Sequence, residues 1–421
     1  MFPNPHDALP LPARPNLERY KKIAKDLTKA CRSSDPDAFR HWSRSFVETL
    51  VDRAALTIPP GMPVDVQRWI DQLAAFAQKK VSGASPEGTA CRLTDAQFVI
   101  ARSHGFASWQ RFAAHLDALA HAGSGAARFE AAVDAVVAGD VTRLQHLLAE
   151  DPSLVRQWSS REHRATLLHY VAANGVEGYR QKTPSNIVEI AELLLAAGAD
   201  VDAVADLYGA ECTTLGLAAT SVQPERAGVQ EALLATLLAH GAEIDRPASA
   251  GRSPSIVGAC LANGRLEAAA YLAERGARLD FAGACGLGRL DAVRSYYRGD
   301  QGSTPRRTAA GTDVLARELR DGFINACLYG RRAIVALMLE HNASLVTLEG
   351  GSGQSALHCA VIGGHADVVR LLLERGASLT AENVYGATPL GQALWSAANG
   401  GDPARFAAVF DVLAAFGAEI P

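Results

Sequence analysis

Histidine and cysteine are the residue types in this chain best suited to metal binding or proton transfer, and it contains 12 histidines and 7 cysteines. His163, His169 and His240 do not have the spacing of metal ligands. His358 and Cys359 are neighbours, but consecutive side chains of a helix point in different directions and do not form a dyad. We therefore expect no catalytic residue, no metal site and no bound cofactor, and we favour a protein that is not an enzyme.

The cysteines also indicate the cellular compartment of the protein. They form no C-x-x-C pair, and Cys260, Cys285 and Cys327 lie in apolar segments that read as helices. Buried free thiols in a reducing compartment explain this pattern better than disulfides or zinc, so we expect a cytoplasmic protein. Residues 1–15 lack the basic start and apolar core of a signal peptide, and their prolines predict an extended leader on the surface.

Composition argues against two classes of partner, nucleic acids and membranes. Of the 421 residues, 48% are hydrophobic and 20% charged, and the formal net charge is −4. A dedicated nucleic-acid binder has a dense basic field, which this chain lacks, so we do not expect nucleic acid as the partner. No apolar run approaches the 18 residues of a membrane-spanning helix, so we expect no membrane partner either.

One structural unit recurs along two thirds of the chain, and residues 353–378 are its best copy. The pattern predicts a helix capped by Ser355, a tight turn, a second helix and a stop at Gly376 in the left-handed conformation. Leu357 is expected on the apolar face of the first helix, and Leu372 on that of the second. A single unit cannot bury these faces alone, so neighbouring units must stack.

This unit resembles the 33-residue ankyrin repeat, with Ser-Ala-Leu-His at 355–358 where the family usually reads Thr-Pro-Leu-His. The resemblance covers about 128–421 and implies a solenoid of about eight repeats with short β-hairpin fingers. His169 and His358 would then make structural hydrogen bonds between repeats. Asn342 takes the place of the glycine stop in the sixth copy, where we expect a left-handed residue.

Extra residues separate the paired helices of some repeats, as in 176–186. Thr183-Pro184 predicts the cap and first residue of the helix that follows. We favour tolerated loop growth for these insertions, and a second binding edge is the alternative.

Residues 16–121 predict a separate helical domain that caps the open end of the solenoid. Asn16, Thr94 and Ser108 are expected helix caps, and Phe106 and Phe112 are expected core anchors. The helix–turn–helix at 93–119 is similar to a segment of bacterial ankyrin-repeat proteins of unassigned function. As a DNA reader, its second helix would offer only a thin basic face, so we favour a packed cap.

The fold class is thus all-α: a leader (1–15), a helical N-terminal domain (16–121) and an ankyrin solenoid (128–421). We expect a non-catalytic scaffold or adaptor that binds a protein partner, which the sequence does not identify. The alternatives are an enzyme or enzyme subunit with a site between the N-terminal domain and the solenoid, and a nucleic-acid-associated regulator. The resemblance places the partner-binding side chains on finger tips and first helices: Glu162, His163, Asn174, Glu211, Arg252, Tyr329, Ile362, Tyr385 and Trp395.

Overall fold

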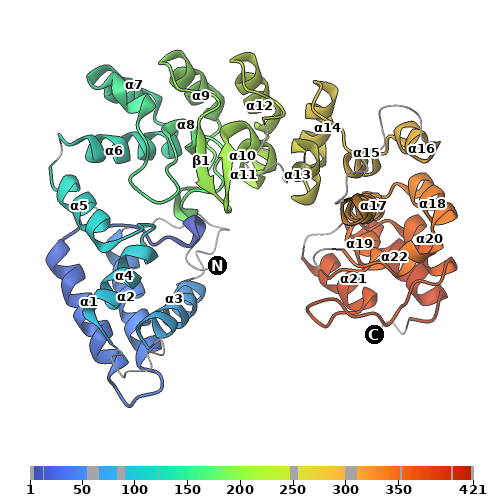
Figure 1. Ribbon diagram of the computed structural model, residues 1–421, viewed down its shortest axis with the longest axis horizontal. Coiled ribbons are helices and arrows are strands. Elements are labelled where there is room, and N and C mark those ends of the chain that lie inside the picture. Colours follow the sequence, from blue (N-terminus) through green and yellow to red (C-terminus); the bar gives the residue numbers. More distant parts are fainter. Residues whose placement is uncertain are drawn as a thin grey trace. The chain divides into compact units, whose positions relative to one another are not determined.

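The computed structural model divides into two compact units, Met1–Ser253 and Pro254–Pro421, and helices dominate both (Figure 1). This all-α architecture is the one expected from the sequence. The described residues are 4–12, 14–54, 66–82, 91–121, 123–246, 255–298, 311–350, 353–399 and 402–418. The candidate Arg252 therefore lies outside the described residues.

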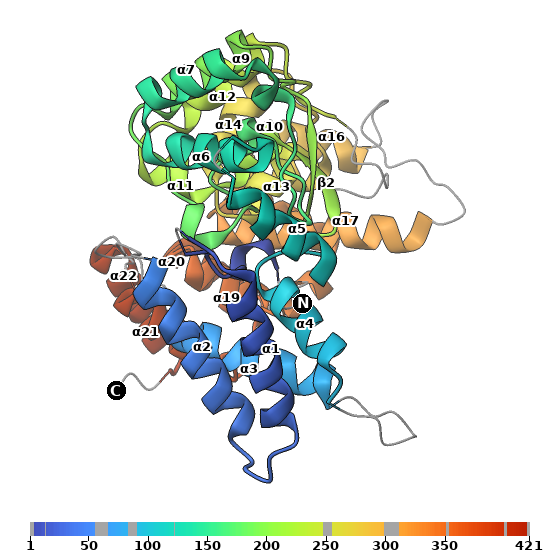
Figure 2. The ribbon, with the colours of Figure 1, turned by 90° about the vertical axis from the view of Figure 1, so that its left-hand side faces the viewer.

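The first unit begins with helices that pack side by side around one apolar core (Figure 2). Tyr20, Phe106 and Phe112 are fully buried in this core, as expected for the two phenylalanines. The helices are α1 (Leu17–Cys31), α2 (Ala38–Ala54), α3 (Val66–Val81), α4 (Leu93–Ser103) and α5 (Trp109–Leu119).

Two of the three predicted caps in this region are confirmed. The side chain of Asn16 accepts a hydrogen bond from the backbone N–H of Arg19, and Ser108 accepts one from Arg111. The prediction for Thr94 is wrong, because the N-cap of α4 lies two residues earlier, at Arg92, whose side chain makes no capping hydrogen bond.

The leader is part of the fold rather than a surface tail. Pro5–Asp7 form a short 3-10 helix, η1, and residues 7–10 are buried, which corrects the expected surface position. The N–H of Leu9 donates to the carbonyl of Ser103 at 2.7 Å, and the carbonyl of Leu9 is 2.9 Å from Nδ1 of His104. Asp7 pairs with Arg68 at 3.0 Å. The leader is thus fixed between α3 and the end of α4.

The expectation of free thiols is wrong for one pair of cysteines. Cys31, at the end of α1, forms a disulfide with Cys91, just before α4, across 60 residues of sequence. Helices α1 and α4 pack against each other, which brings these two positions together although no sequence motif links them. Cys260, Cys285 and Cys327 are free and buried, as expected.

Paired helices follow α5 in the first unit, with a β-hairpin between two of the pairs (Figure 1). The elements are α6 (Gly125–Ala138), α7 (Val141–Glu150), η2 (Pro152–Arg156), α8 (Leu167–Tyr170), η3 (Gly178–Arg180), α9 (Ile187–Ala196), β1 (Val204–Leu207), β2 (Ala210–Thr213), α10 (Thr214–Thr220), α11 (Val222–Arg226) and α12 (Gln230–Ala239). The hairpin is one of the expected fingers, and its strands are antiparallel with Asp206 opposite Glu211.

The second unit continues the same helix pairs around its own apolar core. Its elements are α13 (Ile256–Ala262), α14 (Leu266–Glu274), α15 (Phe281–Leu287), α16 (Leu290–Arg298), α17 (Gly311–Leu328), α18 (Arg332–His341), η4 (Ala343–Thr347), α19 (Ala356–Ile362), α20 (Ala366–Glu374), α21 (Pro389–Ala398) and α22 (Pro403–Ala415). Leu357 and Leu372 are buried in this core, as the repeat pattern predicts.

Hydrogen bonds of the two motif histidines link neighbouring repeats. Nε2 of His169 is 3.3 Å from the carbonyl oxygen of Cys212, and Nε2 of His358 is 2.9 Å from that of Ala387. Ser355 caps α19, as expected, by accepting from the N–H of His358. These histidines therefore have the structural role that the resemblance implies.

Two predicted turn residues behave differently from the expectation. Asn342 is not left-handed: its φ is −151°, and its side chain instead caps η4 by accepting from the N–H of Ser344. Thr183-Pro184 do not start a helix, because α9 begins at Ile187 after Asn186. Gly376 does adopt the expected left-handed conformation, with φ at +91°.

In the part of the chain that the structure describes, no helix combines the length and the apolar character needed to cross a membrane.

Candidate functional site

A cluster of buried charges joins three segments of the first unit. Glu130 lies on α6, Arg161 precedes α8, and Glu177 and Arg180 belong to the insertion after α8. Nε of Arg161 is 2.7 Å from Oε1 of Glu177, and Nη1 of Arg180 is 2.7 Å from Oε2 of Glu130. The insertion that we expected to be tolerated loop growth therefore supplies two of the charges that hold the first repeats together.

The same cluster extends to the N-terminal helices through α5. Nδ1 of His115 lies 2.8 Å from Oγ of Ser160, and Nε2 of His115 lies 3.8 Å from Oε1 of Glu130. At the surface, Arg102 at the end of α4 pairs with Glu162. These contacts bind the N-terminal helices to the first repeats within one unit.

The charges in this cluster set its protonation. Burial by itself raises the pKa of Glu130, but Arg161 and Arg180 outweigh burial and lower it to about 2. Burial likewise opposes ionisation of Glu177, yet Arg161 holds its pKa well below the usual value. Burial and, to a smaller extent, the nearby Arg161 lower the pKa of His115 to about 4. At neutral pH both carboxylates are thus ionised and His115 is neutral, which suits a fixed cross-link better than proton transfer.

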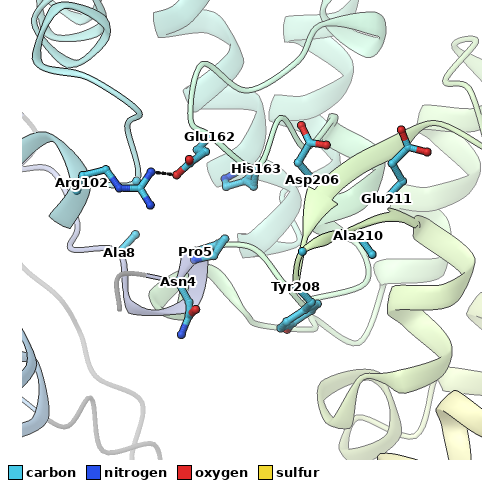
Figure 3. Close-up of a pocket in the computed structure, with 12 residues that line it drawn as sticks. Asn4, Pro5, Ala8, Arg102, Glu162, His163, Asp206, Tyr208, Ala210 and Glu211 are labelled. Carbon is cyan, nitrogen blue, oxygen red and sulfur yellow. Dashed lines mark hydrogen bonds and ion pairs between the residues drawn. The ribbon is translucent and has the colours of Figure 1, made fainter. Parts of the chain in front are cut away.

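A cleft of about 770 Å³ lies next to this cluster (Figure 3). Its walls come from η1, the end of α4, the segment before α8 and the β1–β2 hairpin. The lining residues are Asn4, Pro5, Ala8, Arg102, Gly105, Glu162, His163, Asp206, Tyr208, Gly209, Ala210 and Glu211. Three residues predicted from the repeat register, Glu162, His163 and Glu211, therefore share one cleft.

His163 does not have the exposure that we expected. Only 2% of His163 is accessible to solvent, and both of its ring nitrogens face groups of the same repeat. Nδ1 accepts a hydrogen bond from the N–H of Ala165 at 3.0 Å, and Nε2 is 3.5 Å from Oε1 of Glu177. The prediction of an exposed histidine is wrong, since the segment before α8 folds inward onto the charge cluster.

The hairpin presents its side chains through a tight turn at Tyr208 and Gly209. Both residues have positive φ, +54° and +76°, as a two-residue hairpin turn requires. The hydroxyl of Tyr208 donates to Oδ1 of Asn174 at 2.7 Å, while the amide group of Asn174 donates to the carbonyl of Leu217. Asn174, predicted as a partner-binding residue, therefore positions the finger and is only half-buried.

The predicted residues of the second unit differ in exposure. Tyr385 and Trp395 are 84% and 64% exposed, and Ile362 at the end of α19 is also exposed. Tyr329 is half-buried, and its hydroxyl donates to the carbonyl of Leu261, so the expectation that it is free and exposed is wrong.

The exposure of Tyr385 has a local cause. The side chain of Asn383 is buried and accepts hydrogen bonds from the N–H groups of Tyr385 and Ala387, at 2.9 and 3.1 Å. Gly386 completes the turn with φ at +73°. The finger before α21 is therefore held in one conformation with its tyrosine at the tip, next to the exposed Val384.

Sequence reasoning missed the charges that organise the first unit. Glu130, Arg161 and Arg180 were not singled out, because each is an ordinary charged residue in its own segment. One local signal was that the insertion 176–186 carries the charged residues Glu177 and Arg180. The positive φ of Tyr208, which is uncommon for an aromatic residue, is visible only in the structure.

Comparison with known proteins agrees with the repeat pattern. Residues 285–403 match the family described as ankyrin repeats (3 copies), and residues 163–206 match the family described as ankyrin repeat. A curated relative from Danio rerio, ankyrin repeat and SAM domain-containing protein 6, is 36% identical over 96 residues. That alignment covers 22% of this chain and only 13% of the length of the zebrafish protein.

Solved structures with a similar fold include two ankyrin repeat domains. The domain of Bcl-3, a member of the IkappaB protein family, aligns with 68% of this chain and 97% of its own length, at 20% identity and a TM-score of 0.31. The domain of human ASB11 aligns with 69% of this chain and 99% of its own length, at 20% identity and a TM-score of 0.34. Likenesses this loose indicate no function.

Proposed function

We propose that this chain, which belongs to the ankyrin-repeat family, is a non-catalytic scaffold or adaptor that binds a protein partner through its C-terminal repeats. Ankyrin repeats are in general a module for protein–protein interaction. The observation that carries the proposal is the pair of exposed aromatic side chains, Tyr385 and Trp395, on the last finger and on α21. Exposed aromatic residues on a rigid support are the usual anchors of protein interfaces.

The test compares two variants at exposed positions of the same unit. Capture from cells that express the protein, followed by identification of the bound proteins, would be done with Tyr385→Ala/Trp395→Ala and with Phe416→Ala. Removing an interface aromatic costs about 2 kcal/mol or more of binding, so the double variant should lose its partner while Phe416→Ala keeps it. Both should melt like the parent, because exposed positions change stability by within about 0.5 kcal/mol. Unchanged capture, or unfolding of the double variant, would contradict the proposal.

The enzyme alternative required a cleft with titratable side chains between the N-terminal helices and the repeats. The first unit has such a cleft, lined by Arg102, Glu162, His163, Asp206 and Glu211. Its histidine has both nitrogens turned to groups of the repeat, and Glu162 is paired with Arg102. We therefore favour binding over proton transfer at this cleft.

The nucleic-acid alternative required a basic stripe on the N-terminal helices. Helix α1 carries Lys22, Lys25 and Lys29 at helical spacing on its surface, and Lys29 pairs with Asp26 at 3.0 Å. DNA-binding proteins neutralise about six to ten phosphates, which is more than this stripe offers. Helix α5 is the helix that would contact DNA bases, and its residue His115 is buried in the core. These observations favour a protein partner.

We also propose a cytoplasmic location, supported by the buried free thiols Cys260, Cys285 and Cys327. The Cys31–Cys91 disulfide is the observation that weighs against it. Alkylation of the protein in intact cells, followed by mass spectrometry, distinguishes the two: a cytoplasmic chain should have Cys31 and Cys91 alkylated, and a fully oxidised pair would contradict the proposal.

A further inference from the structure

We propose that the cleft between η1 and the β1–β2 hairpin is a second binding site, which receives an arginine side chain of a partner peptide. The cleft is about 770 Å³ in volume, which is large enough for a long side chain and its neighbours in the chain. It lies in the first unit, whereas Tyr385 and Trp395 lie in the second, so this proposal does not depend on the proposed function of those aromatic residues.

The charges of the cleft define the ligand. Arg102 and Glu162 pair with each other, so their charges offset. Asp206 and Glu211 remain, and within the described residues no cationic group lies within ion-pair distance of either carboxylate. The ring of His163 faces the buried cluster, with Nε2 3.5 Å from Oε1 of Glu177. The cleft therefore carries an excess of negative charge, which is complementary to a cation.

The arrangement of the two carboxylates is unusual for a hairpin that stands alone. Asp206 and Glu211 are direct cross-strand partners, and Figure 3 shows their side chains extending to the same side of the hairpin. Like charges at such positions destabilise a β-ladder, because their Cβ atoms are only about 5 Å apart. A cation held between the two would remove this repulsion. The hairpin is therefore arranged for a ligand that contacts both carboxylates at once.

The aromatic wall favours arginine over lysine. Tyr208 lines the same cleft, with 68% of the residue exposed, and its hydroxyl is fixed by Asn174. A guanidinium group is flat and weakly hydrated, packs on aromatic faces and offers several N–H donors in one plane. It can donate to neighbouring carboxylates simultaneously, whereas an ammonium group acts as a compact point charge.

The backbone holds these groups in place before any ligand binds. The N–H of Asp206 donates to the carbonyl of His163 at 2.8 Å, so the finger is joined to the segment that carries Glu162. The opposite wall is fixed because Asp7, next to the lining residue Ala8, pairs with Arg68. A site that is already formed loses little conformational entropy on binding.

The test uses acetylated heptapeptides with a fixed central residue and randomised flanking positions. Three libraries carry arginine, lysine or citrulline at the centre, and citrulline has nearly the shape of arginine without its charge. The full-length protein should enrich the arginine library over both others. Equal binding of the citrulline library, or no enrichment of arginine, would overturn the proposal, and equal binding of lysine would overturn the choice of arginine.

Variants then locate the site with the best arginine peptide, by fluorescence anisotropy. Asp206→Asn/Glu211→Gln should weaken binding at least tenfold. The matched control is Glu189→Gln/Glu192→Gln, which removes the same charge from the surface of α9. Tyr208→Asn should weaken binding severalfold while keeping the turn, since asparagine tolerates positive φ. If the control weakens binding as much as Asp206→Asn/Glu211→Gln, only net charge matters and the site is wrong.

Discussion

At the scale of single residues, Glu177 is a buried carboxylate with several charged neighbours in the first unit. It is fully buried and lies within ion-pair distance of Arg161, His163 and Arg180. A buried ion pair gains little over apolar packing, but removal of one partner leaves the other charges buried without compensation. The cluster is therefore cooperative, and its members cannot be replaced singly.

Replacement of Glu177 by alanine tests this directly. We expect Glu177→Ala to lower the free energy of unfolding of the first unit by about 3–5 kcal/mol, because Arg161 would remain buried with half of its compensation. Urea denaturation followed by circular dichroism measures the change. Glu189→Ala, on the exposed face of α9, is the control and should change stability by within about 0.5 kcal/mol. Equal effects of the two substitutions would show that the cluster contributes nothing specific.

Buried histidines predict a second residue-scale effect, the loss of stability in acid. Burial lowers the pKa values of His104, His115 and His169 to about 3, 4 and 4. An unfolded histidine has a pKa near 6.5, so below that pH the unfolded chain binds protons that the folded chain does not. Stability should therefore fall between pH 6.5 and 4, by up to about 1.4 kcal/mol per pH unit for each histidine.

Urea titrations between pH 7.5 and 4 measure this slope, and His115→Gln should make it shallower. Glu130 acts in the same direction at lower pH, because its folded pKa of about 2 lies below its unfolded value and its contribution is lost between those values. Stability that is constant from pH 7.5 to 4.5 would show that the histidines are not buried in their neutral form.

At the scale of elements, the leader forms one wall of the cleft. Leu9 is buried, its N–H and carbonyl both contact the end of α4, and the preceding residues line the cleft. The leader therefore stabilises the N-terminal helices as well as shaping the site. Neither role follows from its proline-rich composition, which only disfavours helix.

A substitution at Leu9 tests whether the leader stabilises the fold or is only a surface tail. Leu9→Ala should lower the free energy of unfolding by about 2–4 kcal/mol, because it leaves a cavity among the N-terminal helices. Arg14→Ala, at an exposed position of the same segment, should leave stability nearly unchanged. Thermal and urea unfolding measure the stability of both variants. Equal stability of the two would show that the leader is a surface tail and not part of the core.

At the scale of the whole molecule, the two units predict how the chain can be divided. Each has its own apolar core, one formed by the helices of 254–421 and another by the N-terminal helices. The predicted division at 121–128 remains a prediction, and contacts such as His115 with Ser160 cross it. The repeats next to the N-terminal helices should therefore need them.

Fragments test this expectation. Residues 1–253 and 254–421 should each unfold cooperatively when expressed alone, because each keeps its core. Residues 128–253 should melt at a lower temperature than 1–253 and aggregate, since removal of α5 exposes the charge cluster and apolar helix faces. Differential scanning calorimetry and light scattering measure both properties. A fragment 128–253 as stable as 1–253 would show that the N-terminal helices are independent.

The sequence by itself determined the repeat unit, because its signals act over short distances. The cap at Ser355, the left-handed Gly376 and the spacing of Leu357 and Leu372 each depend on residues within one repeat. The exposure of Tyr385 was also predictable, since the register places it at a finger tip.

Tertiary structure alone decided which charges meet. Arg161 and Glu130 are 31 residues apart in the sequence, and Arg180 and Asp134 are 46 residues apart. No local sequence pattern therefore predicts that they pair. The same holds for the burial of His163, which follows from its position against Glu177. The cleft is assembled from four distant segments, and its carboxylates Asp206 and Glu211 face no cation among the residues that the structure describes. Both features depend on long-range packing that residue spacing does not encode.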